Sequence, residues 1–337
     1  MYRWGLLLGM VWCSLAFGFS DAHTKGDYCK RALSEAPPKT FRIVTFNTKD
    51  LHINIENNKI SNSRNRVDKF HRYPKTLDQV ERLADVIKST DPDIAVLQEV
   101  DSANELHFLN SNYFNNRYDV YFMDGNDTRG FEIAFLVRRG MPINIEIETH
   151  KHMRWVDPNT NHELPMFSRD APAFIVRKNG EERPLFVLMG HHAKSKAGNK
   201  DDFEGIRMRT AQHEALAELV TKYQNKFGAD VPIMIAGDYN TDIHDAPETQ
   251  SIRQVMTDAF DMAQKKLRDD DRVTHTTFAQ DRRGKYAQLD GIMISKGSRI
   301  KVLRSGVRRD VSKLARSFKE RDKQISDHFL VYADIEL

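Results

Sequence analysis

The chain has 337 residues, of which 29% are charged and 40% are hydrophobic, and its formal net charge is +3. This composition excludes a polytopic membrane protein and argues against a disordered chain. At roughly 100–200 residues per domain, the length predicts one or two domains.

The N-terminus has the pattern of a secretory signal peptide. Arg3 precedes an apolar stretch from Leu6 to Phe19, and polar residues follow from Ser20. A positive residue before an apolar core of about 7–15 residues is typical of such peptides, and the stretch is shorter than the ~20 residues that span a bilayer. We predict a signal peptide over residues 1–22 and a secreted or periplasmic protein with no stable membrane insertion after cleavage. An uncleaved membrane anchor is the alternative.

The part of the chain after the signal is poor in cysteine. Of the 2 cysteines, only Cys29 remains once the signal is removed. No internal disulfide can then form, so a hydrophobic core must hold the fold. Residues 23–40 are polar and contain Pro37 and Pro38, which predicts a tail. Residues 41–337 contain no Gly/Ser/Pro-rich linker and are predicted to form one domain, which we expect to be a monomer.

Short apolar runs alternate with helical patterns through this domain. Apolar residues recur at helical spacing from Leu77 to Ile87, and a long helix is predicted over Ile206–Tyr223. Strands are predicted at Phe41–Phe46, Ile94–Leu97, Tyr118–Met123, Ile133–Val137, Ile143–Ile147, Ala173–Val176, Leu185–Met189, Val231–Ala236, Leu289–Ile294 and Phe329–Ile335. Many strands with few helices favour a mixed α/β sandwich over a regular barrel of alternating strands and helices.

Polar residues stand at the ends of these otherwise apolar strands. They are Asn47, Glu99, Asp238, Asn240, Asp290, Asp327 and His328. Any one of them, taken alone, is more often a turn residue or a helix cap. Because chemically compatible types recur at so many strand ends, a site assembled at one edge of a sheet is the better interpretation.

These residue types suit a definite chemistry. Mg²⁺ prefers carboxylate and amide oxygens, so Glu99 with Asn47 would make a sparse, open metal site. Asp238 and Asn240 lie on the same face of an extended chain, where one can accept a proton from water while the other donates a hydrogen bond. A carboxylate such as Asp290 can fix the tautomer of a histidine. The cysteine count excludes a thiolate zinc site.

The order of the short motifs FN, QE, GDxN, LD and SDH resembles the endonuclease/exonuclease/phosphatase superfamily, from about Phe41 to Leu337. That superfamily includes deoxyribonuclease I, exonuclease III-like repair enzymes, neutral sphingomyelinases and inositol polyphosphate 5-phosphatases. The resemblance implies an α/β fold of the deoxyribonuclease I type, a four-layer sandwich of two packed mixed β-sheets flanked by helices. It also implies metal-assisted in-line attack of water on phosphorus.

The resemblance also implies a role for each matching residue. Glu99 would bind Mg²⁺, with Mn²⁺ or Ca²⁺ as alternatives, and Asn47 and Asp327 would lie beside the metal. Asp238 and Asn240 would handle the water nucleophile and the phosphate. His328, held by Asp290, would contact the phosphate or act as acid or base.

Further positions match the family less closely. His192 matches its second histidine, but His191 stands where the family commonly has Asn or Thr. Glu132 is a candidate for the carboxylate that orients His192. Arg169 matches a phosphate-contacting arginine, and an ordinary surface ion pair is its alternative. Lys49, two residues after Asn47, is a candidate substrate contact.

Two basic stretches favour nucleic acid as the substrate. HHAKSKAGNK resembles the HFKSK stretch of secreted bacterial nucleases. The segment Arg299–Lys323 has ten Lys/Arg and three Asp/Glu, a net charge of +7, and basic faces attract the phosphate backbone. Alternatively, Val311, Leu314, Ala315 and Phe318 place this segment on an amphipathic helix with a merely solvated face. We expect an endonuclease that cleaves DNA, with RNA as an alternative.

Other functions remain open. A sphingomyelinase-like phospholipid phosphodiesterase would need an apolar tip, for which Phe108, Tyr113 and Phe114 are the available aromatics. Inositol phosphatases are disfavoured because the tryptophan that precedes GDxN in them is Ala236 here. A catalytically silent binding module is a third class. The polar segment Leu51–Tyr73 is predicted to be a flexible loop on the substrate side.

Overall fold

The computed structural model describes residues 39–56, 59–60, 74–196, 201–265, 267–278, 284–310, 315, 317, 320 and 324–337. They belong to one compact unit, Ala36–Leu337. The predicted signal peptide over residues 1–22 and nearly all of the predicted tail over 23–40 lie outside the described residues. Residues 57–58 and 61–73 of the predicted substrate-side loop also lie outside them, and its described part contains two short strands, β2 (Ile55–Glu56) and β3 (Lys59–Ile60).

The first large sheet has six strands, and its central pair is parallel. In spatial order the strands are β17 (Lys301–Arg308), β18 (Leu330–Glu336), β1 (Thr40–Leu51), β4 (Ile94–Val100), β6 (Glu132–Arg138) and β5 (Tyr118–Met123). Strands β1 and β4 run parallel, and every other neighbouring pair is antiparallel. The parallel pair therefore presents two carboxyl ends, those of β1 and β4, at the same edge of the sheet.

The second large sheet repeats this arrangement with six other strands. In spatial order they are β13 (Met256–Asp258), β16 (Asp290–Ser295), β12 (Ile233–Asp238), β11 (Pro184–His192), β10 (Ala173–Lys178) and β7 (Ile143–Glu148). Here β11 and β12 form the parallel pair, and His192 is level with Asp238. Two mixed sheets are thus present, as the sequence predicted.

Shorter elements complete the fold. The two remaining hairpins pair β8 (Arg154–Val156) with β9 (Glu163–Pro165) and β14 (His275–Phe278) with β15 (Gly284–Ala287). The helices are α2 (Leu77–Thr90), α3 (Ala103–Asn112), α4 (Ile206–Phe227), α5 (Gln250–Val255), α6 (Ala259–Met262) and α7 (Asp269–Arg272), with short 3₁₀ turns η1 (Phe203–Gly205) and η2 (Pro247–Thr249). Among the described helices, none has the length and apolar character needed to cross a membrane.

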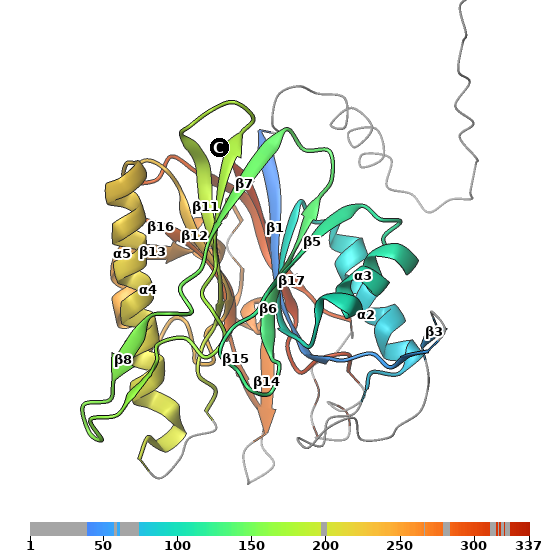
Figure 1. Cartoon of the computed structure of the whole chain (residues 1–337), viewed down its shortest axis with the longest axis horizontal. Coiled ribbons are helices and arrows are strands. Elements are labelled where there is room, and N and C mark those ends of the chain that lie inside the picture. The colour runs from blue at the N-terminus through green and yellow to red at the C-terminus, as the bar shows by residue number, and fades with distance from the viewer. Residues whose placement is uncertain are drawn as a thin grey trace, which may run out of the picture. The chain divides into compact units, whose positions relative to one another are not determined.

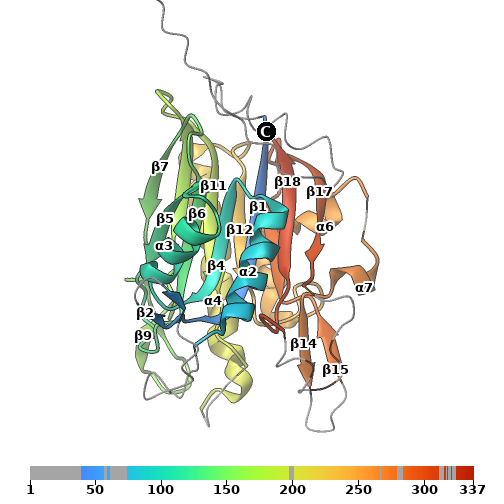
Figure 2. The same cartoon turned by 90° about the vertical axis from the view of Figure 1, so that its right-hand side faces the viewer.

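The elements form four layers. Helices α2 and α3 cover the outer face of the first sheet, and α4 and α5 cover that of the second (Figure 1). The view turned by 90° shows α2 in front of β1 and β4 (Figure 2). Side chains such as Phe41, Val96, Phe174 and Ile292 are fully buried where the two sheets face each other. The predicted four-layer sandwich is confirmed.

Helix α2 shows how the local sequence fixes these layers. Thr76 caps its first turn, and Gln79 returns a hydrogen bond to the cap, so the start of the helix is defined. Its apolar residues Leu83 and Ile87 lie one turn apart and pack on Val44 and Leu97 of the first sheet. The apolar residues that recur at helical spacing in the sequence therefore form the face of α2 that packs on the first sheet.

The basic segment Arg299–Lys323 is not a single amphipathic helix. Its first third is strand β17, in which Lys301 pairs with Glu336 and Arg308 with Leu330. Three exposed cations of this part have carboxylate partners: Arg299 contacts Asp230, Lys301 contacts Glu336 and Arg304 contacts Asp334. Of the apolar residues that suggested the helix, Ala315 is buried, and Val311, Leu314 and Phe318 lie outside the described residues.

Candidate active site

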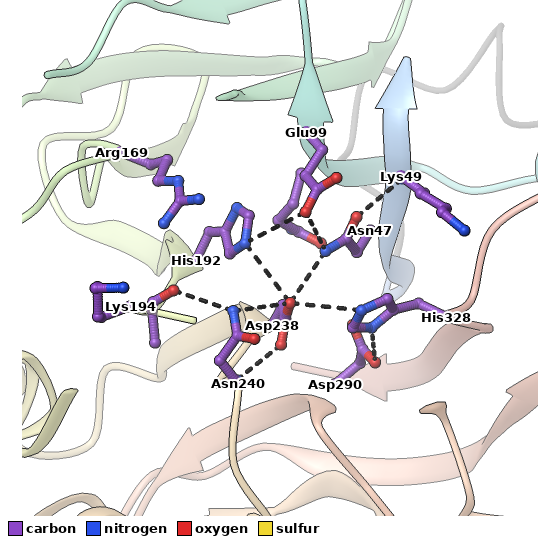
Figure 3. Close-up of polar contacts among 12 residues, drawn as sticks. Asn47, Lys49, Glu99, Arg169, His192, Lys194, Asp238, Asn240, Asp290 and His328 are labelled. Carbon is purple, nitrogen blue, oxygen red and sulfur yellow. Dashed lines mark hydrogen bonds and ion pairs between the residues drawn. The ribbon is translucent and has the colours of Figure 1, made fainter. Parts of the chain in front are cut away.

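Most of the predicted site residues converge at one end of the two sheets. The carboxyl ends of four strands lie there, those of β1, β4, β11 and β12, together with the amino ends of β16 and β18. Figure 3 shows the side chains around Asp238, which comes from the last position of β12. Segments up to 279 residues apart in sequence meet here, because Ser326 donates a hydrogen bond to the carbonyl of Asn47.

Asp238 is the centre of the hydrogen-bond network. Its Oδ2 accepts from the Asn47 amide at 3.0 Å and from the Asn240 amide at 3.2 Å, and its Oδ1 accepts from the Asn240 N–H at 2.7 Å. Burial raises the pKa of Asp238 to about 6, with the Asp290 charge adding to the rise and His328 opposing it. A carboxylate with this pKa is suited to accept a proton near neutral pH.

Glu99 and Asn47 lie together, as expected of metal ligands. The Asn47 amide donates to Glu99 Oε1 at 3.3 Å, and the Asp50 N–H donates to Glu99 Oε2 at 3.0 Å. Glu99 adopts a left-handed backbone conformation with φ +59°, which is uncommon for a non-glycine residue and turns the strand end. The Glu99 carboxylate is partly exposed and, with the amide oxygen of Asn47, offers hard oxygen donors, so this pair fits a divalent cation such as Mg²⁺.

Asp327 stands on the other side of this pair. Its Oδ2 lies 3.8 Å from Lys49 Nζ and 3.9 Å from His275 Nε2. His275 itself packs against His328, with ring centroids 4.3 Å apart. Ligand atoms of His275, Asp327 and His328 lie close enough to one another to hold a cation together. Asp327 thus has a mixed environment of carboxylate, imidazole and ammonium groups.

The predicted pairing of Asp290 with His328 is confirmed. Nδ1 of His328 lies 2.8 Å from Asp290 Oδ2, and both side chains are buried. Burial alone would lower the pKa of His328, but the charges of Asp290 and Asp238 and the hydrogen bond with Asp290 raise it to about 10. His328 is therefore an imidazolium at neutral pH, with Nε2 directed toward the Asp238 side, 3.8 Å from Oδ2.

His192 is present in the site, but Glu132 does not orient it. Its Nε2 lies 3.6 Å from Asp238 and 3.8 Å from Glu99, whereas its Nδ1 has no hydrogen-bond partner within the described part of the chain. Burial lowers the pKa of His192 well below its ordinary value, with Arg169 adding to the effect, so the ring is neutral. The expectation that Glu132 holds this ring is wrong in this structure.

Glu132 and His191 lie in the layer behind the site. Burial, together with Asp127, raises the pKa of Glu132 to about 8, although the Gly125 N–H opposes the rise. His191 packs edge-on against His213 and Tyr239, and its ring points away from the substrate side into the α4 layer. His191, where the residue type departs from the family pattern, therefore contributes to packing against α4, and within the described residues its ring makes no hydrogen bond to the network around Asp238.

Arg169 is buried and directed toward the site. Only 4% of its side chain is exposed, and its Nε lies 3.0 Å from Asp127, so Arg169 does form an ion pair, but a buried one and not a surface one. Its guanidinium points toward His192 (Figure 3). Lys49 lies on the opposite side of Asp238, and its exposed ammonium extends away from the centre. Both predicted substrate contacts are thus near the site, on different flanks.

Sequence reasoning missed two residues next to these. His275 belongs to the β14–β15 hairpin, and Lys75 immediately precedes helix α2. Lys75 is buried although lysine is among the residue types least often buried. The only sequence signal for His275 is its position between threonines in THTTF. Nothing near Lys75 in the sequence marks that lysine as buried.

Comparisons with known proteins identify the family and the fold. A sequence model of the endonuclease/exonuclease/phosphatase family matches residues 51–328. No curated protein matches the sequence. Among solved structures, truncated TDP2 from Caenorhabditis elegans is similar with a TM-score of 0.57 and 16% identity, over 88% of this chain and 98% of that one.

Two bacterial structures are similar to the same extent. A family protein from Bacteroides vulgatus has a TM-score of 0.56 and 17% identity, over 88% of this chain and 99% of that one. Mannosyl-6-phosphatase Bt3783 from Bacteroides thetaiotaomicron has a TM-score of 0.56 and 15% identity, over 88% of this chain and 100% of that one. These likenesses show a shared fold. With the family match over most of its length, the chain belongs to the endonuclease/exonuclease/phosphatase family.

Proposed function

We propose that the protein is a secreted, Mg²⁺-dependent nuclease that hydrolyses phosphodiester bonds in DNA, with RNA as a further substrate. Members of its family are hydrolases that act on phosphoester bonds and generally depend on a divalent metal. The proposal goes beyond this by naming the substrate and the metal, and secretion is proposed from the N-terminal signal pattern alone.

The observation that carries the proposal is the placement of cations on both flanks of Asp238. Lys49 lies on one flank, and Arg169 and Lys194 lie on the other (Figure 3). A polymer with a phosphate on each side of the scissile bond would meet a cation in both directions. A phosphomonoester, which ends at the reacting phosphate, would use one flank alone.

The first third of the basic segment, Arg299–Arg308, supports nucleic-acid binding less than its composition suggests, whereas most of the remaining basic residues lie outside the described part of the chain. Strand β17 begins at the end of the sheet opposite to His328, and its exposed cations near that end are already paired with carboxylates. Exposed, paired charges contribute little to binding. The flanking cations at the site are therefore the relevant ones.

The chain's own residues can carry out the hydrolysis. Asp238 accepts the proton of the attacking water, and the Asn240 amide, held by the carbonyl of Ala193 at 3.1 Å, keeps Asp238 in place. The His328 imidazolium donates a hydrogen bond to a phosphate oxygen, and Asp290 holds its charge. Bound at Glu99 and Asn47, a divalent cation would neutralise charge that develops on the phosphate.

A phospholipid phosphodiesterase is the second candidate. The aromatics considered from the sequence do not support it, because Phe108 and Phe114 are buried. Two other apolar side chains do favour it: Phe203 is 76% exposed and Ile206 is 42% exposed. Both follow the His192–Lys196 segment closely, and Gly205 approaches the carbonyl of Ser195.

The deciding experiment offers purified protein supercoiled plasmid, linear DNA labelled at its ends, RNA, sphingomyelin vesicles and a soluble phosphomonoester. Each substrate is tested with and without EDTA. We expect nicking of the plasmid and loss of activity with EDTA. Glu99→Ala should be inactive, and Glu214→Ala, which changes an exposed glutamate of α4, should behave as the wild type. Cleavage of sphingomyelin or the monoester alone would overturn the proposal, and no cleavage at all would favour the silent binding module.

A further inference from the structure

Lys75 is a buried cation that contacts the segment leading to Asp327 and His328 of the candidate active site. It precedes Thr76, the cap of helix α2, and 6% of the residue is exposed. Its backbone N–H donates to the carbonyl of His52 at 2.8 Å, which ties the start of the helix to the segment that follows β1. Burying an ammonium costs free energy unless hydrogen bonds and opposite charges compensate for the loss of water.

The ammonium contacts the segment that carries two predicted site residues. Lys75 Nζ donates a hydrogen bond to the carbonyl of Ile325 at 2.8 Å, across 250 residues of sequence. The next residue, Ser326, donates to the carbonyl of Asn47 at 2.8 Å and accepts the N–H of His328 at 3.1 Å. The segment Ile325–His328 is therefore held on one side by Lys75 and on the other by β1.

The same ammonium lies within the electrostatic reach of the metal-site carboxylates. Burial lowers the pKa of Lys75 to about 8, and Lys49 lowers it further, while Asp50, Glu99 and Asp327 oppose the fall. Lys75 is still largely charged at neutral pH. Because the surroundings are buried, its charge is weakly screened and acts on any cation that approaches Glu99 and Asp327.

We propose that Lys75 is a positioning residue: it fixes the Ile325–His328 segment through the Ile325 carbonyl, and its buried positive charge weakens divalent-cation binding at Glu99 and Asp327. The inference rests on the proposed function for the identity of the site. It assigns Lys75 two separable effects, one through a hydrogen bond and one through charge. A lysine that only stabilised the fold would produce neither a tighter metal site nor a selective loss of kcat.

The test compares three variants. Lys75→Met removes the charge and the hydrogen bond at similar length, and Lys75→Gln removes the charge but keeps a donor. Lys88→Met removes an exposed lysine of the same helix as a control. Isothermal titration of metal-free protein gives the Kd for Mn²⁺, bis(4-nitrophenyl) phosphate gives kcat and KM, and thermal melting reports folding.

For Lys75→Met we expect Mn²⁺ to bind about 3–10-fold more tightly, because a repelling charge is gone. We expect kcat to fall about 10-fold or more with KM within about twofold, because Asp327 and His328 lose their fixed position. Lys75→Gln should share the tighter metal binding and retain more of kcat. Lys88→Met should match the wild type.

Unchanged or weaker Mn²⁺ binding in the folded Lys75 variants would overturn the inference. If neither variant folds, Lys75 is an element of the core and the inference fails as well. Metal titration needs no substrate, so the result is independent of the proposed function. A wild-type protein that binds Mn²⁺ but cleaves no phosphodiester would refute the function alone.

Discussion

The two opposite ends of the sandwich both contain charged residues, but these charges are fully paired at one end and crowded together at the other. At the end away from the site, Arg42 donates to both oxygens of Asp334, at 2.6 and 2.9 Å, and to the carbonyl of Thr90 at 2.7 Å. Asp93 accepts from the Arg42 N–H and from Arg138. Each of these charges has an opposite partner and good hydrogen-bond geometry.

The site end leaves polar atoms without partners. Within the described residues, Nδ1 of His192, Oδ1 of Asp290 and Oε2 of Glu132 are buried and make no hydrogen bond. Glu99 and Asn240 also adopt left-handed backbone conformations, with φ of +59° and +52°. Such features each cost stability and persist where the surrounding structure enforces them.

The contrast shows that stabilising charge pairs and the candidate site residues occupy opposite ends of the molecule. Fully paired charges at the far end and the apolar layers hold the sheets, and this rigidity permits carboxylates and histidines to crowd at the other end. The buried, unpartnered atoms and the left-handed backbone at the site end cost stability, and the paired charges and apolar layers elsewhere compensate for that cost. The following variants test this division, from the largest expected effect to the smallest.

Removal of the Glu99 charge should separate activity from stability most clearly. For Glu99→Gln we expect phosphodiesterase activity to fall about 10³-fold or more, because the cation that offsets phosphate charge loses its carboxylate ligand. The melting temperature without metal should not fall, because a crowded negative charge is removed. Activity within about tenfold of the wild type would contradict the metal assignment.

Loss of the Asp290 charge should change both the rate and its pH dependence. The pKa of His328 is raised to about 10, so the imidazolium persists until the pH passes that value. In Asp290→Asn the main supporting charge is gone, so the pKa falls and the alkaline limb of kcat/KM moves to lower pH. We expect kcat to fall about 10²–10⁴-fold. An alkaline limb at the wild-type position would show that His328 does not act as the cation.

At the opposite end, the expected effect is on stability alone. Arg42→Leu should lower the free energy of unfolding by about 1–3 kcal/mol, because the Asp334 carboxylate and the Thr90 carbonyl lose the guanidinium that donates to them. The loss stays within this range because the Arg42 side chain is itself partly exposed. Arg304→Leu, at an exposed arginine that also contacts Asp334, is the control and should cost less than about 1 kcal/mol. Both variants should keep the wild-type kcat/KM. A change in kcat/KM in either variant would contradict the division between the two ends.

Glu132 offers an effect on stability that is confined to high pH. Its pKa rises from 4.5 to about 8 on folding, so the unfolded chain releases this proton first. Stability from this group is complete below about pH 4.5 and is lost as the pH rises toward 8. Glu132→Gln removes that loss and should be more stable than the wild type above pH 8, on the order of 2 kcal/mol. Denaturant titrations at pH 4 and pH 9 give the comparison, and an equal difference at both would contradict it.

The sequence predicted most of the elements because their apolar patterns are local. The strand predicted at Tyr118–Met123 has those bounds in the structure, and the helix predicted from Ile206 continues to Phe227. Residues at strand ends were also predictable, since turns place polar types there. The pairing of Asp290 with His328 followed from their chemistry and from the family resemblance.

What the sequence could not predict depends on distances between distant segments. Lys75 contacts Ile325, and His275 contacts His328, through tertiary packing that no local pattern encodes. The distance between Glu132 and His192 likewise depends on how two different sheets face each other. The same holds for charge: the sequence shows that Arg299, Lys301 and Arg304 are basic, but not that carboxylates from distant parts of the chain pair with them.

The position of β18 has a consequence for the order of events during synthesis. This strand lies between β17 and β1, and the residues just before it include His328, yet it is made long after β1. Until β18 inserts, β1 and β17 both have an open edge, which invites pairing with other chains. Closure of the first sheet and delivery of His328 are the same step, so the candidate site is incomplete in a growing chain until this sheet has formed.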